Sequence, residues 1–351
     1  MKPLVSILIP AFNAQEWIAD TLRSAIRQTW PRKEIIVVDD GSGDQTLDIA
    51  RRFESNGVRV VSQSNQGAAA ARNVAYALSR GDYIQWLDAD DLLGPDKIAS
   101  QMDDGVAHGG SKRMLLSAAW GRFMYRAHRA QFVPTPLWRD LSPVEWLLLK
   151  LERNVWMQTA TWLVSRELTE AAGPWNTQLL GDDDGEYFCR VLLASNGTRF
   201  IPEARVFYRI SGINSLSYVG RSDQKMEALF LSIQLHIGYL RSLEDGERVR
   251  AACVKFLQDS LLVFYPDRFD IVERAEQLAA TLGGRLQVPR LSWKYAWIQK
   301  SFGWPLAKQG MFVARHMKGS VLRLWDKVLY RLENPTVDRQ AAAKVSKVNL
   351  D

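Results

Sequence analysis

Short apolar runs alternate with amphipathic segments over about the first 90 residues of the chain. Four runs rich in Val, Ile and Leu have the length of buried strands and end at proline or polar turn residues. They cover residues 4–10, 34–38, 58–62 and 83–87. Between them, apolar residues recur at helical spacing over 13–30, 46–53 and 67–79. This alternation predicts a mainly parallel sheet with helices on both faces.

The alternation weakens after about Gly105. Residues 115–125 have a strand-like pattern, whereas helices are expected near 143–151 and over 183–194. From about residue 222 to residue 282 the pattern is mainly helical, and the chain has no internal repeat. The sequence therefore predicts an α/β domain followed by a helical C-terminal region.

Residues 293–333 combine basic and aromatic side chains. Eight Lys and Arg residues face only two acids, Asp326 and Glu333, and Trp, Phe and Leu side chains lie between them. One interpretation is a pair of basic amphipathic helices on an anionic membrane surface. The other is a helical subdomain whose aromatic side chains pack on the rest of the protein. The last residues, 335–351, are expected to form a flexible tail.

Composition narrows the class of protein only slightly. Of the 351 residues, 47% are hydrophobic and 24% are charged, which is ordinary for a globular protein. The formal net charge of +6 favours anionic partners such as phosphate esters, acidic lipid or nucleic acid. Two cysteines exclude a disulfide framework. With no signal peptide and no long uncharged apolar run, we expect a cytoplasmic protein whose membrane contact, if any, is peripheral.

Two acidic clusters follow predicted strands. In Asp39-Asp40-Gly41-Ser42, a carboxylate could accept a hydrogen bond from a nucleobase or a ribose, although the same residues suit an ordinary turn. In Asp88-Ala89-Asp90-Asp91, two carboxylates could hold Mg²⁺ or Mn²⁺, although a solvated loop before a capped helix has the same composition. Ligands of parallel sheets bind beyond the carboxyl ends of the strands, so both clusters are expected along one rim.

A third acidic cluster, Asp182-Asp183-Asp184-Gly185-Glu186, opens a predicted helix. Carboxylates stabilise a helix N-terminus, so capping is one explanation. Four acids in five positions are more than capping needs. One of them is therefore a candidate general base.

These motifs, taken in order over residues 3 to about 218, resemble the family 2 glycosyltransferases and their GT-A fold, a Rossmann-like and mostly parallel sheet with flanking helices. The matching segments are Val5 to Asn13, Gln28-Thr29-Trp30, Ile36 to Ser42, Asn65-Gln66-Gly67, Ala71-Arg72-Asn73, Gly81 to Asp91, and Asp183 to Phe188. The resemblance implies an inverting transfer of one sugar from a nucleoside-diphosphate sugar, with UDP ahead of GDP and dTDP, to an acceptor hydroxyl. The Q-x-x-R-W motif of the processive members is missing, which favours single transfers.

The resemblance also implies roles for individual residues. The nucleotide-binding set would be Pro10, Ala11 and Phe12 around the base, Asp40 bonded to it with Asp39 in support, and Asp88 on the ribose or the metal. Asp90 would ligate Mn²⁺ or Mg²⁺. Asp184 would be the catalytic base, with Asp183 as the second choice because many relatives have Glu-Asp there. Arg72 would either shape the donor site or lie as a charge on the helix surface. Arg209 resembles part of a later family segment that ends in Ser215 and Ser217.

The implied organisation divides the chain into five parts. They are a nucleotide-sugar-binding half (1–105), an acceptor-binding half with the base (106–220), a helical extension (221–285), basic aromatic amphipathic helices (286–334) and the tail (335–351). The acceptor would be a glycan or a lipid-linked molecule, in surface polysaccharide or lipopolysaccharide assembly, and no nucleic acid is expected. Five tryptophans could stack on sugars or simply fill the core: Trp120, Trp138, Trp146, Trp156 and Trp162.

Three other functions compete with this interpretation. A dinucleotide oxidoreductase would need glycine where Thr46 follows Gly41-Ser42-Gly43, and an acidic residue about 20 positions later. An aspartyl-nucleophile phosphatase would need Thr or Val at the position of Leu92, two residues after its second aspartate. A non-catalytic nucleotide-sugar-binding protein would leave the acidic helix start without a role.

Overall fold

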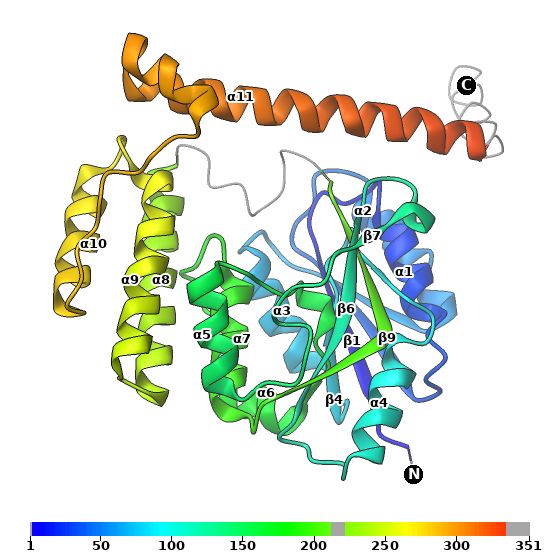
Figure 1. Ribbon diagram of the computed structural model, residues 1–351. Coiled ribbons are helices and arrows are strands. Elements are labelled where there is room, and N and C mark those ends of the chain that lie inside the picture. Colours follow the sequence, from blue (N-terminus) through cyan, green and yellow to red (C-terminus); the bar gives the residue numbers. More distant parts are fainter. Residues whose placement is uncertain (1, 212–221, 335–351) are drawn as a thin grey trace. The chain divides into compact units, whose positions relative to one another are not determined.

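The computed structural model describes residues 2–211 and 222–334 (Figure 1). These residues form two compact units. The first comprises 2–121, 132–208 and 222–290, and the second comprises 122–131, 209–211 and 291–334. The expected tail over 335–351 lies outside the described residues, as do Ser215 and Ser217.

A five-stranded sheet forms the centre of the first unit. Its strands lie in the order β3 (Val58–Ser62), β2 (Lys33–Asp39), β1 (Val5–Ala11), β4 (Tyr83–Trp86) and β8 (Val164–Ser165). The first four are mutually parallel, and β8 pairs with β4 in the antiparallel direction. Every residue of β1 is buried, as expected for a central strand covered on both faces. The predicted parallel sheet is therefore confirmed, with one short antiparallel strand added at its edge.

The helices between these strands also follow the sequence pattern. They are α1 (Ile18–Ile26), α2 (Thr46–Arg51) and α3 (Ala68–Leu78), and α4 (Lys97–Ala107) follows the short strand β5. On α3, Ala69, Ala71 and Ala75 are buried, so their small side chains let this helix approach the sheet closely.

A second, four-stranded sheet lies in the order β5 (Leu92–Leu93), β9 (Thr198–Arg209), β6 (Leu115–Phe123) and β7 (Gln131–Phe132). The strand expected over 115–125 is β6. The long strand β9 was not predicted, because Pro202 and outward charges such as Glu203 and Arg205 interrupt its apolar positions.

The remaining helices of the first unit are α5 (Pro143–Arg153), α6 (Arg166–Ala172), α7 (Asp183–Ala194), α8 (Asp223–Leu243), α9 (Glu247–Phe264) and α10 (Phe269–Thr281), with short 3₁₀ turns at Glu54–Asn56 and Thr159–Thr161. Local signals set the ends of α5. The Ser142 side chain accepts a hydrogen bond from the Glu145 amide, Pro143 occupies the first turn, and Asn154 ends the helix in the left-handed conformation. Helix α7 packs against α6 and α8, which holds its acidic N-terminus in place.

The second unit contains a 3₁₀ turn at Ala127–Arg129 and the helix α11 (Trp293–Glu333). Gly303, at a φ of 82°, breaks α11 just before Pro305. No helix in the described part of the chain has the length and apolarity that a bilayer crossing needs.

Candidate active site

The carboxyl ends of β1 and β2 lie side by side. Their parallel register places Ala11 opposite Asp39, and the Asp40 amide donates a hydrogen bond to the Ala11 carbonyl oxygen at 2.8 Å. Pro10 and Ala11 are buried, whereas the Phe12 side chain is 48% exposed at the rim. The structure therefore brings together the five residues that the sequence assigned to a nucleobase pocket.

Both oxygens of the buried Asp40 carboxylate already have protein partners. One accepts hydrogen bonds from the Gln63 side chain at 2.7 Å and the Gln66 amide at 2.9 Å, and the other accepts one from the Gly67 amide at 2.8 Å. Gly67 has a φ of +91°, a conformation that favours glycine. Asp40 thus fixes the loop between β3 and α3.

Asp39 differs from its neighbour. Its Oδ2 accepts hydrogen bonds from the Ser42 amide at 3.2 Å and the Ser62 hydroxyl at 3.4 Å. Its Oδ1 is buried and has no hydrogen-bond partner among the described residues. A buried carboxylate oxygen without a donor is costly unless a ligand or water supplies one. The sequence assigned the contact with a nucleobase to Asp40, whereas the buried oxygen without a described partner belongs to Asp39.

Arg72 connects the end of β4 to the start of α7. Its guanidinium donates to Asp183 at 2.6 Å and to Asp88 at 2.8 Å, and it lies 4.4 Å from the centre of the Trp175 ring. Asn73 holds Trp175 through two hydrogen bonds to its backbone, at 2.8 and 2.9 Å. Arg72 is buried, so its interpretation as a charge on the helix surface is wrong.

Asp184 lies beside this ion-pair network, directly after Asp183 in the sequence. Its carboxylate accepts hydrogen bonds from the Thr159 hydroxyl at 3.0 Å and the Gly185 amide at 2.9 Å. Burial raises the pKa of Asp184 to about 6, and the negative charges of Asp183 and Asp182 add to the shift. Burial also raises the pKa of Asp183, and the Arg72 charge opposes the shift at both carboxylates.

Tyr208, on β9, lies within reach of four of the acidic side chains. Its pKa is raised by burial and then by the negative charges of Asp91, Asp90, Asp88 and Asp184. Because such interactions weaken with distance, the four carboxylates lie in the neighbourhood of this phenol. Asp90 and Asp184 are thus both near Tyr208, although 94 positions separate them in the sequence.

The start of α7 is not explained by capping alone. The Asp182 side chain makes no capping hydrogen bond. Instead its Oδ2 accepts one from the Ser232 hydroxyl of α8 at 2.6 Å. A Cβ on Gly185 would come within 2.1 Å of Asp182 Oδ1, so any other residue here would displace the Asp182 side chain from its present position.

Residues 6–106 match the family model named Glycosyl transferase family 2. Residues 6–106 are therefore similar to glycosyl transferase family 2. Among curated relatives, the chain is 42% identical over 105 residues to the putative teichuronic acid biosynthesis glycosyltransferase TuaG of Bacillus subtilis, a match that covers 29% of this chain and 42% of TuaG. It is 44% identical over 104 residues to chondroitin synthase of Escherichia coli, covering 29% of this chain and 15% of the synthase. The chain thus spans less than half the length of these relatives.

A match of lower identity extends further along the chain. An uncharacterized glycosyltransferase of Rickettsia typhi is 25% identical over 265 residues, which cover 75% of this chain and 80% of the relative. The solved structure of Staphylococcus aureus TarS 1–349 in complex with UDP shares the fold, with a TM-score of 0.57 at 17% identity, over 84% of this chain and 78% of TarS. The GT-A fold expected from the resemblance is therefore confirmed.

Several residues of this site had no role predicted from the sequence. Thr159 contacts Asp184, and its neighbour Gln158 donates to Asp91, so one short segment joins two of the acidic clusters. Tyr208 is the third such residue, because it lies near the acidic side chains. Each of the three is far along the chain from its partners, so no local pattern in the sequence predicts these contacts.

The tryptophans divide between core and surface. Trp120, Trp146 and Trp162 are buried. Trp156 is 38% exposed, and its ring lies edge-on to Tyr208 with 5.7 Å between the ring centres. Trp156 is therefore the tryptophan of this region best placed to contact a ligand beside the carboxylates.

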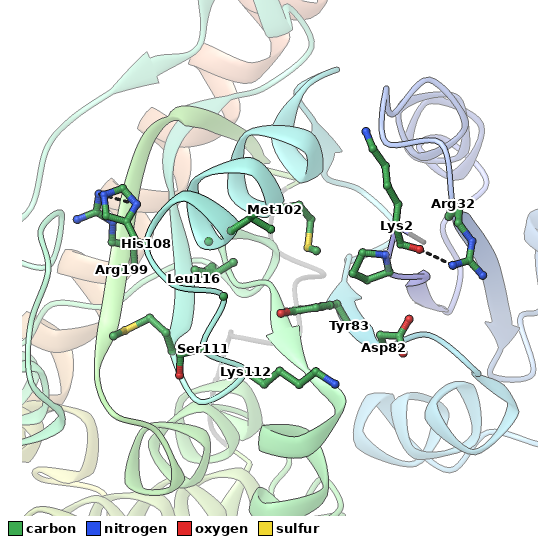
Figure 2. A pocket seen from close by; sticks show the side chains of 15 residues that line it. Lys2, Arg32, Asp82, Tyr83, Met102, His108, Ser111, Lys112, Leu116 and Arg199 are labelled. Carbon is green, nitrogen blue, oxygen red and sulfur yellow. Dashed lines mark hydrogen bonds between the residues drawn. The ribbon is translucent and has the colours of Figure 1, made fainter.

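A cavity of about 340 Å³ lies elsewhere, at the amino ends of β1 and β4 (Figure 2). Lys2, Asp82 and Tyr83 are among the residues that line it. Because parallel strands begin at this edge and end at the other, the cavity is separate from the acidic site.

No group of three or more His, Cys, Asp or Glu side chains with the geometry of a metal site occurs within 2–211 and 222–334. The predicted pair, Asp88 and Asp90, supplies hard oxygen donors of the type that Mg²⁺ and Mn²⁺ prefer. Such ions commonly keep water and substrate phosphate oxygens as further ligands. Two carboxylates are therefore enough protein ligands for Mg²⁺ or Mn²⁺.

Proposed function

We propose that the chain is an inverting glycosyltransferase that moves a single sugar from a UDP-linked donor to an acceptor hydroxyl. One observation carries the proposal: Arg72 pairs with both Asp88 and Asp183, the neighbour of Asp184, at the sheet edge where ligands of such folds bind. The family match over residues 6–106 supports glycosyl transfer. The structural relative TarS has been solved with UDP and with UDP-GlcNAc, which supports uridine as the nucleoside.

The donor's base would bind at the ends of β1 and β2, against Pro10, Ala11 and Phe12. There Asp39 Oδ1 would accept a hydrogen bond from an N–H of uracil, which would satisfy this buried oxygen. Asp40 would act indirectly, by holding the 63–67 loop against the pocket.

Family 2 enzymes commonly use a divalent cation. Asp90 would ligate it with Asp88, and the bound ion would neutralise charge on the departing diphosphate. Arg72 would keep Asp88 and Asp183 in position through the two ion pairs that it makes.

Asp184 would serve as the general base. The acceptor oxygen would form a bond to the anomeric carbon while the bond from that carbon to the diphosphate oxygen breaks. The proton of the acceptor hydroxyl would pass to Asp184, and the nucleoside diphosphate would leave on the opposite face, which inverts the configuration. With a pKa of about 6, Asp184 is ionised at neutral pH and is a stronger base than an ordinary aspartate.

The acceptor side would be formed by residues 106–220, with 1–105 forming the donor side. Trp156 would offer its exposed edge to an acceptor sugar beside Tyr208. The names of the curated relatives, which include teichuronic acid biosynthesis, support a glycan or lipid-linked acceptor in surface polysaccharide assembly at the cytoplasmic face of the membrane.

A thermal-shift screen of UDP-, GDP- and dTDP-sugars, with and without Mn²⁺, tests the donor site. We expect a UDP-sugar to raise the Tm, and Mn²⁺ to enlarge this increase. Asp90→Ala should remove the effect of Mn²⁺, whereas Asp103→Ala, the same change on the exposed part of α4, should not. UDP release with a panel of acceptors then tests turnover. Stabilisation by UDP-sugars without any release would indicate a binding protein and not an enzyme.

A further inference from the structure

The outer side of α11 carries an apolar stripe. Beyond the break at Gly303, apolar residues recur every three, four or seven positions, which places them on one helix face. They are Leu306, Val313, Met317, Val321, Leu324, Val328 and Leu332, and each is between 43% and 72% exposed. We call these seven residues the α11 stripe.

The polar side of the same helix makes its packing contacts within the second unit. Asp326 accepts hydrogen bonds from the Tyr125 amide at 2.9 Å and from the Arg126 side chain at 2.8 Å. Tyr330 and Lys327 lie beside the Tyr125 ring, with Tyr330 at 6.1 Å between ring centres. An ordinary surface helix buries its apolar side and exposes its polar side. In this unit α11 instead leaves an apolar face exposed.

The positive charge of the whole chain is concentrated in this helix. Residues 293–333 hold eight Lys and Arg against two acids, an excess of six, which equals the net charge of all 351 residues. The two acids, Asp326 and Glu333, both pair with Arg126. The rest of the chain is therefore neutral in sum, and the segment that carries the exposed stripe also carries the net positive charge.

The first segment of α11 has a related character. Trp293 is 81% exposed and Trp297 is 60% exposed, and Lys294 and Lys300 are exposed near them. Tryptophan and lysine are the side chains that favour the boundary between lipid headgroups and acyl chains.

We propose that the α11 stripe docks on a bilayer that contains anionic phospholipid, with α11 parallel to the membrane plane. The apolar stripe would enter the acyl boundary, and the exposed Lys294, Lys300 and Lys318 would meet the lipid phosphates. A second copy of the chain is a poorer occupant, because it would bring two strongly basic helices together without acids to balance them. The proposal does not depend on the proposed transferase activity.

Vesicle co-sedimentation of the full chain tests the proposal. The vesicles contain phosphatidylcholine alone or with phosphatidylglycerol. The stripe variant is Val321→Glu with Leu324→Glu. Its matched control, Val106→Glu with Val288→Glu, introduces the same two negative charges at apolar residues that are 67% and 60% exposed outside α11. Circular dichroism and Tm show whether each variant is folded, and sedimentation velocity without lipid reports self-association.

We expect the wild type and the control to bind phosphatidylglycerol vesicles and to release them in high salt. Val321 and Leu324 would place seven side-chain carbons in the bilayer, and the two glutamates remove this apolar contact. Vesicle binding by the folded stripe variant should therefore weaken roughly tenfold or more. A milder pair, Lys300→Gln with Lys318→Gln, should weaken binding to anionic vesicles only. Failure of the wild type to bind, or equal binding by the stripe variant, would overturn the proposal. So would a dimer that the stripe substitutions dissociate, without any lipid binding.

Discussion

The structure contains two pairs of adjacent aspartates, one at the end of β2 and one at the start of α7. In both pairs the two carboxylates differ in how fully protein partners occupy them. Asp40 is committed to the 63–67 loop and Asp183 to Arg72. Their neighbours can each accept a further hydrogen or proton. Asp39 has a buried oxygen without a described hydrogen-bond partner, and Asp184 has a raised pKa. In each pair, one carboxylate holds the fold and its neighbour is available for chemistry.

The order of the two roles differs between the pairs. After β2 the available residue comes first, whereas at α7 it comes second. The partners decide this order, and they lie far away in the sequence: Gln63 and Gly67 for Asp40, and Arg72 for Asp183. An Asp-Asp motif therefore identifies a site but does not say which of its two carboxylates meets the substrate.

The largest expected effect is on the rate of sugar transfer, and it should come from a change at Asp184. Asp184→Asn removes the proposed base and should lower the transfer rate about 10²–10⁴-fold, while UDP-sugar binding is kept. Asp183→Asn should damage activity through the position of Arg72, and with it the fold. Steady-state transfer and donor titration on both variants check this. Parallel losses of binding and turnover in Asp184→Asn would count against its role.

In the first pair, Asp40 should contribute more than Asp39 to the free energy of unfolding. Asp40→Asn leaves an amide N–H group facing one or more of the three donors that Asp40 now satisfies. We expect the free energy of unfolding to fall by about 2–4 kcal/mol. Denaturant unfolding, with Asp39→Asn as the matched variant, measures the difference. Equal losses from the two variants would remove the distinction between them.

Asp184 should also have a pH-dependent effect on stability. The pKa of Asp184 is higher in the folded chain than the ordinary value of 3.8, so its ionisation opposes folding. This loss of stability develops as pH rises from about 4 to about 6 and persists above. Asp184→Asn should therefore raise the free energy of unfolding at pH 7 by about 1–3 kcal/mol, with little change near pH 4. Unfolding curves at the two pH values check this difference.

The smallest effect should be on nucleotide choice. In Asp39→Asn, the amide oxygen must stay where Ser42 and Ser62 donate, so the NH₂ group replaces Oδ1. A donor then faces the uracil N–H, and UDP binding should weaken about tenfold. Cytosine has an acceptor at the equivalent ring nitrogen, so CDP should gain relative to UDP. Calorimetric titration of both nucleotides measures this change, and an unaltered preference would show that the base binds elsewhere.

Much of the fold could be predicted because the strands β1 to β4 and their helices each carry a local pattern. The strand β3 was predicted at its observed bounds, residues 58–62. Strand β9 was not, because its charged positions hide the alternation. The acidic rim followed from the parallel sheet, but contacts of Thr159 and Tyr208 depend on how distant segments pack. Local patterns fix the elements, whereas side-chain partners depend on tertiary structure.

The pH dependence of sugar transfer tests the central claim, that Asp184 is the general base of an acidic site built by four distant segments. For the wild type, kcat should fall below about pH 6 with the slope of a single ionisation, because a protonated Asp184 cannot take the acceptor proton. The residual activity of Asp184→Asn should lack this acid limb. A wild-type rate that is constant from about pH 5 to about pH 8, or an acid limb that survives in Asp184→Asn, would contradict the account.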